Sequence, residues 1–285
     1  MAFTGTEYFQ AGLLSNAMTA SSTHIVGLMS SSPRDLFSVF TASTNTALVY
    51  GLPEAITTVY SGSIVYAGGK FWYSSVVGSS AAIAWIDPSG WTAGLVGPHS
   101  GGVGSITACG DWIYGSGHRY NMSTNTYSTH ARTVSWWGSV GGRLFAVSGT
   151  TLMEVDPSNA SVLGTWTLSK SCTGQGVALG TKLYFGAADN GTPLCWFDAA
   201  TDTVGARSAT PLLSNASTLL QWVAHSDGYL YNTIDNASTR KLLVLDPATG
   251  RWYMDIAVTN RNFRFSVASC GSKLYIQTLA PSYWP

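Results

Sequence analysis

The sequence predicts an all-β protein built from seven copies of one short repeat, and three observations lead to this fold class. Charged residues make up only 10% of the 285 residues, against about a quarter in an ordinary domain. The chain instead holds 31 Gly, 11 Trp and 14 Tyr, a composition that favours strands and tight turns over helices. A turn followed by an apolar and aromatic strand also recurs along the whole chain. No charged or proline-rich linker interrupts it, so we expect one domain over residues 1–285.

Each of the seven copies is recognised by one apolar anchor residue in its apolar and aromatic strand. Neighbouring anchors lie between 32 and 47 residues apart, and the mean repeat of about 41 residues matches the ~40–45 residues of a four-stranded propeller blade. The anchors are Leu36, Phe71, Trp112, Leu144, Leu183, Leu230 and Leu274. The sequence therefore predicts a single seven-bladed β-propeller whose blades are four-stranded antiparallel sheets.

A run of small and β-branched residues precedes each anchor, as in Ser63–Ala67 and Ser105–Cys109. Small side chains suit the innermost strand of a blade, where the blades converge and leave little width. Glycines such as Gly141 and Gly142 follow this run, as a tight hairpin with positive φ requires. No spacing among the four cysteines, Cys109, Cys172, Cys195 and Cys270, predicts a disulfide framework or a zinc site, so we expect all four to be buried free thiols. Cys109 and Cys270 are expected to end innermost strands.

The third strand of the repeat ends in a turn that starts with an acid or an amide. These turns begin at Asp87, Asn121, Asp156, Asp198 and Asp246. An Asp or Asn side chain caps such a turn, and Asn125, Asp202 and Gly250 stand where a left-handed conformation is expected. The acids are therefore predicted to stabilise hairpins. A catalytic role is disfavoured because equivalent residues of a propeller are spread around the ring.

The repeat divides the chain into approximate blades, and the last blade needs a strand from the other end of the chain. The predicted blades are residues 24–59, 60–98, 101–132, 133–168, 172–210, 219–258 and 263–285, the last completed by residues 1–14. Residues 6–12 parallel the outer strand that follows Asp246, so we expect them to pair with the C-terminal blade and close the ring.

No motif of an enzyme, a cofactor site or a membrane protein is present. We find no nucleophile elbow, metalloprotease helix, phosphate loop or dinucleotide fingerprint, so we expect no catalytic residue, no cofactor and no metal. The 14 basic and 14 acidic residues balance without forming blocks, which argues against nucleic-acid partners. No run of 18 apolar residues and no signal peptide are seen, so membrane insertion and export are not expected.

Candidate binding residues are those on the loops that join second to third strands and one blade to the next. Arginine and aromatic side chains beside Asn and Asp suit contacts with proteins and sugars. The set comprises His118, Arg119, His130, Arg132, Trp136, Trp137, Asp189, Arg261 and Arg264. The alternative for Trp136 and Trp137 is that they simply pack between blades.

The segment Asp246-Pro-Ala-Thr-Gly-Arg-Trp252 resembles the outer hairpin of kelch repeats, and its Asp-x-x-Thr-Gly pattern is shared with quinoprotein-type blades. This resemblance implies the fold and no cofactor. In composition the whole chain resembles virion proteins of tailed bacteriophages, in particular minor tail proteins, some of which carry propellers.

The virion resemblance implies a non-enzymatic structural or host-contact protein. Its expected place is the virion, after assembly in the host cytoplasm, and its expected partners are other virion or tail proteins and a host surface protein or glycan. The alternative is a carbohydrate-binding lectin, although the loops differ from blade to blade and so do not predict seven equal sites. A propeller enzyme is the third class.

Overall fold

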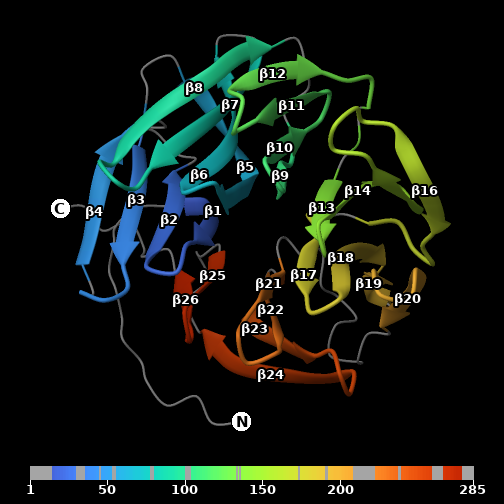
Figure 1. Cartoon of the computed structure of the whole chain (residues 1–285). Coiled ribbons are helices and arrows are strands. Elements are labelled where there is room, and N and C mark those ends of the chain that lie inside the picture. The colour runs from blue at the N-terminus through green and yellow to red at the C-terminus, as the bar shows by residue number, and fades with distance from the viewer. Residues whose placement is uncertain are drawn as a thin grey trace.

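The computed structural model is an all-β propeller whose antiparallel sheets are arranged in a ring (Figure 1). It describes residues 15–277 except 30–35, 45, 53–55, 78–79, 100–103, 133, 135, 173, 190–191, 208–221, 237–238 and 259–265. Within these residues no helix has the length and apolar character that a membrane crossing requires.

The first three blades are four-stranded sheets in which each strand pairs with the next along the chain. Blade 1 consists of β1 (Ser15–Ala20), β2 (His24–Met29), β3 (Leu36–Thr41) and β4 (Thr46–Gly51). Blade 2 consists of β5 (Ile56–Ala67), β6 (Lys70–Val77), β7 (Ser80–Asp87) and β8 (Thr92–His99). Blade 3 consists of β9 (Thr107–Cys109), β10 (Trp112–Gly115), β11 (His118–Asn121) and β12 (Thr126–Thr129).

The next three blades have the same strand order. Blade 4 consists of β13 (Trp136–Val140), β14 (Arg143–Ser148), β15 (Thr151–Val155) and β16 (Val162–Thr167). Blade 5 consists of β17 (Val177–Leu179), β18 (Lys182–Asp189), β19 (Thr192–Asp198) and β20 (Thr203–Arg207). Blade 6 consists of β21 (Val223–Ala224), β22 (Leu230–Asn236), β23 (Thr239–Asp246) and β24 (Arg251–Val258).

The predicted number of four-stranded blades is wrong, because the described residues form six and not seven. The seventh copy of the repeat forms the two-stranded sheet of β25 (Ser266–Cys270) and β26 (Lys273–Gln277). In this sheet β25 packs against β21 of blade 6 and β1 of blade 1. The predicted closing strand, residues 1–14, lies outside the described residues.

The first blade also differs from the prediction in the order of its strands. The anchor Leu36 begins the third strand, β3, whereas the anchors of blades 2 to 6 lie on second strands. The innermost strand is β1, which begins at Ser15, so blade 1 starts before the predicted residue 24. The reason is that β2 carries a run of small and β-branched residues typical of an innermost strand, although β1 takes that place.

The acid and amide turns have the predicted conformation. In each of the five turns the side-chain oxygen of the first residue accepts a hydrogen bond from the backbone N–H two residues on, at 2.7–3.1 Å. The predicted left-handed residues Asn125, Asp202 and Gly250 all have positive φ. Trp91 and Ala160, at the equivalent fifth position of the turns at Asp87 and Asp156, share it. Local turn chemistry therefore sets this backbone position in five blades.

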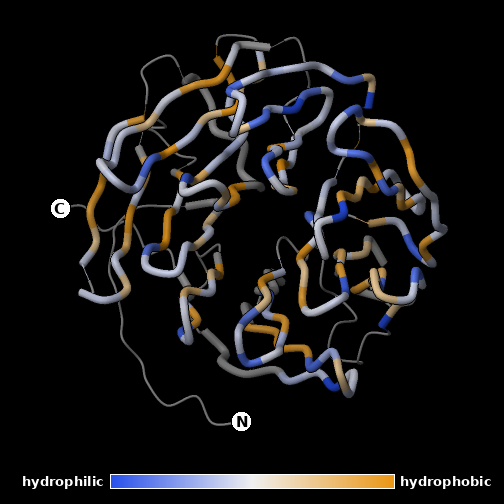
Figure 2. The backbone as a smooth tube through the Cα atoms, in the orientation of Figure 1, coloured by the Kyte–Doolittle hydropathy of each residue, from blue (hydrophilic) through white to orange (hydrophobic). Residues whose placement is uncertain are grey.

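Apolar side chains fill the space between neighbouring sheets. Figure 2 shows apolar stretches in the strands of every sheet. One buried cluster joins blades 1 and 2 through residues such as Phe37 and Tyr73, and another joins blades 4 and 5 through residues such as Phe145 and Phe197. The stability of the ring therefore rests on contacts between blades as well as on pairing within them.

All four cysteines are buried free thiols, as predicted. Cys109 ends the innermost strand β9 and Cys270 ends β25, which confirms their expected positions. Burial raises the pKa of both thiols. These two cysteines therefore pack as small apolar residues.

Candidate functional site

Four of the nine predicted binding residues, Arg119, His130, Arg132 and Trp137, lie where blade 3 meets blade 4. His118 begins β11 and Trp137 lies in β13, and both side chains are fully buried. Arg119, His130 and Arg132 are partly buried at this contact, whereas the partly buried Trp136 packs against the cluster between blades 4 and 5. The structure brings Arg119, His130, Arg132 and Trp137 together, and it holds them in contacts between blades.

Arg119 joins the two blades by donating one hydrogen bond within blade 3 and another to blade 4. Its Nε donates to Ser128 Oγ at 2.8 Å within blade 3. Its Nη1 donates to the carbonyl oxygen of Pro157 in blade 4 at 3.0 Å. The Tyr114 hydroxyl donates to the same carbonyl at 2.6 Å, so one turn of blade 4 accepts two bonds from blade 3. The guanidinium is therefore committed to holding the blades together.

His130 is held between aromatic rings with both ring nitrogens engaged. Its ring stacks on Tyr114 at 5.4 Å and meets Trp137 edge-on at 5.8 Å. Its Nε2 lies 3.1 Å from the carbonyl oxygen of His118, and its Nδ1 accepts the backbone N–H of Arg132 at 3.2 Å. Burial lowers the pKa of His130, and the positive charges of Arg119 and Arg132 act in the same direction. The neutral form of the His130 imidazole is therefore the one favoured in this packed position.

The remaining predicted residues have different outcomes. Arg132 donates from Nε to the carbonyl oxygen of Ala160 in blade 4 at 2.7 Å. Trp136 and Trp137 pack in apolar clusters between blades, which is the alternative that the sequence left open. Asp189 ends β18, where its backbone pairs with Thr192. Arg261 and Arg264 lie outside the described residues.

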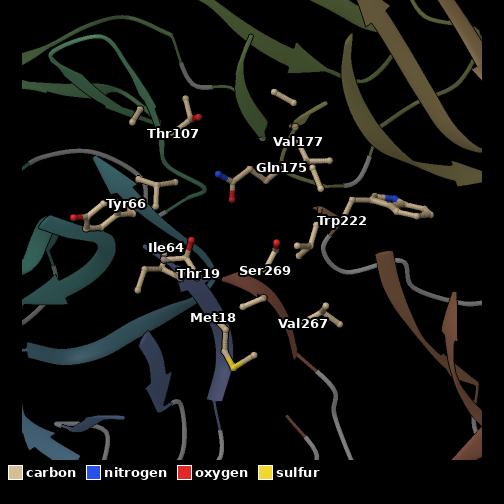
Figure 3. A pocket seen from close by; sticks show the side chains of 18 of the residues that line it. Met18, Thr19, Ile64, Tyr66, Thr107, Gln175, Val177, Trp222, Val267 and Ser269 are labelled. Atoms are coloured by element: carbon tan, nitrogen blue, oxygen red, sulfur yellow. The ribbon is translucent and has the colours of Figure 1, made fainter. Parts of the chain in front are cut away.

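The central channel is the other candidate site, and sequence reasoning did not select its residues. It encloses about 390 Å³ and is lined by the innermost strands of all six blades together with β25 (Figure 3). Thr19, Thr107, Ser139, Gln175 and Ser269 supply polar side chains to its wall. The other described lining residues are mostly small or aliphatic, and none of the lining residues that the structure describes carries a charge.

Gln175 links strands that are distant in sequence across the channel wall. It precedes β17 in blade 5, and its Nε2 donates to the carbonyl oxygen of Ile106 in blade 3 at 2.7 Å. The next residue, Gly176, donates its backbone N–H to Trp137 of blade 4 at 3.0 Å. The buried Oε1 of Gln175 has no hydrogen-bond partner among the described residues. The sequence feature that could have indicated this position is a Gln between two glycines, Gly174 and Gly176, just before an innermost strand.

The channel can form hydrogen bonds, but its described lining residues include no carboxylate, imidazole or amine for proton transfer. Hydroxyl groups both donate and accept, and Ser139 Oγ already donates to the carbonyl oxygen of Ala108 at 2.6 Å. Within the part of the chain that the structure describes, no three His, Cys, Asp or Glu side chains gather as metal ligands would. The arrangement therefore suits binding of a neutral polar group.

Comparisons with known proteins support the fold. A chain in the crystal structure of a mitotic checkpoint complex is similar, with a TM-score of 0.67 and 12% sequence identity. The similar region covers 94% of this chain and 86% of that chain. No protein-family model matches the sequence, and no curated protein does. At this identity the likeness shows a shared β-propeller fold and nothing about function.

Proposed function

We propose that this propeller is a non-enzymatic binding module that works as a structural or host-contact component of a tailed-phage virion. The virion assignment rests on the resemblance in composition to minor tail proteins. The observation that carries the assembly role is the exposure of two uncharged outer strands, β4 and β16.

The outer strand of blade 1 exposes aliphatic side chains on both of its faces. Leu48 is 54% exposed and Val49 is 47% exposed, although neighbouring residues of a strand point to opposite sides. No residue of β4 carries a charge. Natural edge strands usually carry charges or prolines that prevent pairing with other chains. This edge therefore has the character of a surface that a partner covers.

The outer strand of blade 4 has the same character at another part of the rim. Val162 and Leu163 are 37% and 60% exposed, and β16 is also uncharged. Both strands end their sheets and appear as apolar stretches on the rim (Figure 2). Two such edges on one ring suit a subunit that touches two neighbours in a large assembly.

The polar residues that the sequence singled out favour a structural role as well. Arg119 and Arg132 are engaged by carbonyl oxygens of the neighbouring blade, and His130 is held as a neutral ring between blades. Residues fixed in this way preserve the shape of the ring. Because these three side chains hold neighbouring blades together, they favour a role in a binding scaffold over a role in catalysis.

The test is whether the protein occurs in particles and whether β4 holds it there. Peptide mass mapping of virions purified from the source phage should detect the chain. Replacing Leu48 and Val49 together with Lys should remove it from particles, because charge on an edge strand opposes pairing.

Thr92→Lys, at an exposed position of the outer strand β8, is the matched control and should leave incorporation unchanged. The double Lys variant and the Thr92→Lys variant should both have the melting temperature of the parent protein. Absence of the parent chain from purified particles, or equal incorporation of the double Lys variant, would contradict the proposal.

A further inference from the structure

We propose that the central channel binds a neutral saccharide unit, with hydroxyl groups on one side and an apolar C–H face on the other. This inference goes beyond the assembly role, because it concerns the innermost strands and not the rim. It rests on the size, charge and sidedness of the channel.

The volume and the neutrality of the channel define the class of ligand. About 390 Å³ lies within the ~300–1,000 Å³ range of small-molecule sites. Since no lining residue in the described part of the chain is Asp, Glu, Lys, Arg or His, an ionic ligand would lose hydration without gaining a counter-charge from these residues. A neutral ligand avoids this cost.

One side of the channel presents hydroxyl groups. Thr19 on β1 and Ser269 on β25 belong to adjacent strands, and Figure 3 shows both at the channel near Ile64. Thr107 on β9, two blades further round the ring, adds a third hydroxyl at another part of the channel wall (Figure 3). Such groups can donate to and accept from sugar hydroxyls.

Gln175 supplies an acceptor that is unused within the described residues. Its Nε2 is fixed by the bond to Ile106, and Figure 3 shows the amide directed into the channel. The Oε1 of this amide is buried and has no partner among the described residues. A buried acceptor without a donor costs free energy, and a ligand hydroxyl that donates to it removes this cost.

Apart from Gln175, the β17 and β21 side of the ring is apolar. Val177, Val223 and Ala224 line it, while the ring of Trp222 points away from the channel (Figure 3). The three aliphatic side chains offer a surface for the C–H face of a pyranose ring. The channel therefore has the two-sided character that a neutral sugar needs, and its volume of about 390 Å³, near the lower end of the ~300–1,000 Å³ range of small-molecule sites, suits one sugar unit.

The experiment measures binding of free sugars to the full chain by saturation-transfer NMR and calorimetry. The probes are the methyl glycosides of glucose, galactose and mannose, with N-acetylglucosamine, glucuronic acid and glucosamine. We expect at least one neutral probe to bind. We also expect the acid and the amine to bind at least tenfold more weakly than that probe.

Two channel variants separate recognition from folding. Gln175→Leu removes the acceptor and should weaken binding at least tenfold, although it also removes the bond to Ile106. Thr19→Val keeps the shape of the side chain and should weaken binding several-fold with an unchanged melting temperature. Thr165→Val, on the exposed face of β16, is the matched control and should bind as the parent does.

The results distinguish this inference from the assembly role. Failure of every neutral probe to bind at millimolar concentration would overturn it, as would equal binding of the charged probes or undiminished binding by both channel variants. The Leu48 and Val49 double Lys variant should retain sugar binding even if it is lost from particles. Each proposal can therefore fail alone.

Discussion

The contact between blades 1 and 2 and the contact between blades 4 and 5 use the same turn position with different chemistry. In blade 2 the fifth residue of the turn is Trp91, whose ring stacks on Tyr50 of blade 1 at 5.5 Å and meets His24 edge-on at 5.0 Å. In blade 5 it is Asp202, which accepts a hydrogen bond from Arg143 of blade 4 at 2.6 Å. One contact is aromatic and the other is ionic.

The comparison shows that backbone geometry is repeated while the contact chemistry varies. The equivalent residue of blade 4, Ala160, receives Arg132 of the preceding connection on its carbonyl oxygen. In blade 6 it is Gly250, where an added Cβ would lie 3.2 Å from the guanidinium of Arg207 in blade 5. The turn thus directs its fifth residue toward the preceding blade, and each sequence fills that place differently.

Removing the ionic contact should have the largest effect. Arg143 also forms a bidentate pair with Glu154, at 2.7 and 2.8 Å, and its guanidinium lies over the rings of Phe145 and Phe197. Arg143→Ala leaves the largely buried Glu154 carboxylate unpaired, so we expect a loss of about 2–3 kcal/mol in the free energy of unfolding.

Urea denaturation measures the effect of Arg143→Ala. Arg143→Lys keeps the charge but not the bidentate geometry and should recover part of the loss. A stability of Arg143→Ala within 0.5 kcal/mol of the parent would show that the ionic contact is dispensable.

The two regions should respond equally when packing inside a blade is changed. Gly94 in blade 2 and Gly205 in blade 5 each lie under a tryptophan of the neighbouring strand, and an added Cβ would come within 2.3 Å of Trp85 and 2.2 Å of Trp196. Lys70 and Lys182 cover the other faces of these rings at 4.0 and 4.2 Å.

Gly94→Ala and Gly205→Ala should each cost about 1–3 kcal/mol in the free energy of unfolding, because the indole has to move. Gly51→Ala is the control, because no atom of the described residues lies within 4 Å of the added Cβ. Thermal melting of the three variants would separate them. If one of the two alanine substitutions lowered the stability much more than the other, the packing inside blade 2 would differ from that inside blade 5, in addition to the difference in the contacts between blades.

In both contacts the fifth residue of the turn, Trp91 or Asp202, has a positive φ, which costs free energy for a residue other than glycine. Trp91 has a φ of 52°, a region that glycine adopts without strain and that costs free energy for alanine and other residues with a Cβ. Trp91→Ala should lose the stack on Tyr50 and keep the backbone strain, whereas Trp91→Gly loses the stack and relieves the strain. We expect the Gly variant to be more stable than the Ala variant by about 1 kcal/mol, measured by denaturant titration. The opposite order would show that the turn does not set the backbone here.

The smallest effect should be a pH dependence at the contact between blades 3 and 4. Because burial lowers the pKa of His130 below its unfolded value, the unfolded chain binds the extra proton first as the pH falls. The protein should therefore lose stability below about pH 6.5, and the loss should continue until the pH reaches the folded pKa.

Melting curves between pH 7.5 and pH 5 of the parent and of His130→Gln would isolate this contribution. Gln can donate and accept at the same sites without titrating, so its curve should fall less steeply. Parallel curves would exclude His130 as a source of the acid sensitivity.

The repeated turns were predictable from the sequence because they depend on local chemistry. Asn125, Asp202 and Gly250 were assigned a left-handed conformation from residues within one turn, and the structure has it. The order of strands in blade 1 was not predictable from the residues of β2, because small residues are compatible with either of the two inner strands. The channel-lining role of Gln175 depends on Ile106, which lies 69 residues earlier in the chain.

The sequence by itself determined the all-β class, the propeller repeat, the turn geometry and the burial of the cysteines, since these follow from composition and short-range pattern. Tertiary structure alone decided that His118 and Trp137 are enclosed, that Arg143 reaches Asp202, and that the channel residues described by the structure are uncharged. Such contacts join residues from different blades, and their distances are set by how the sheets pack around the ring. A loop residue that looks available in the sequence becomes an internal contact once the neighbouring blade covers it.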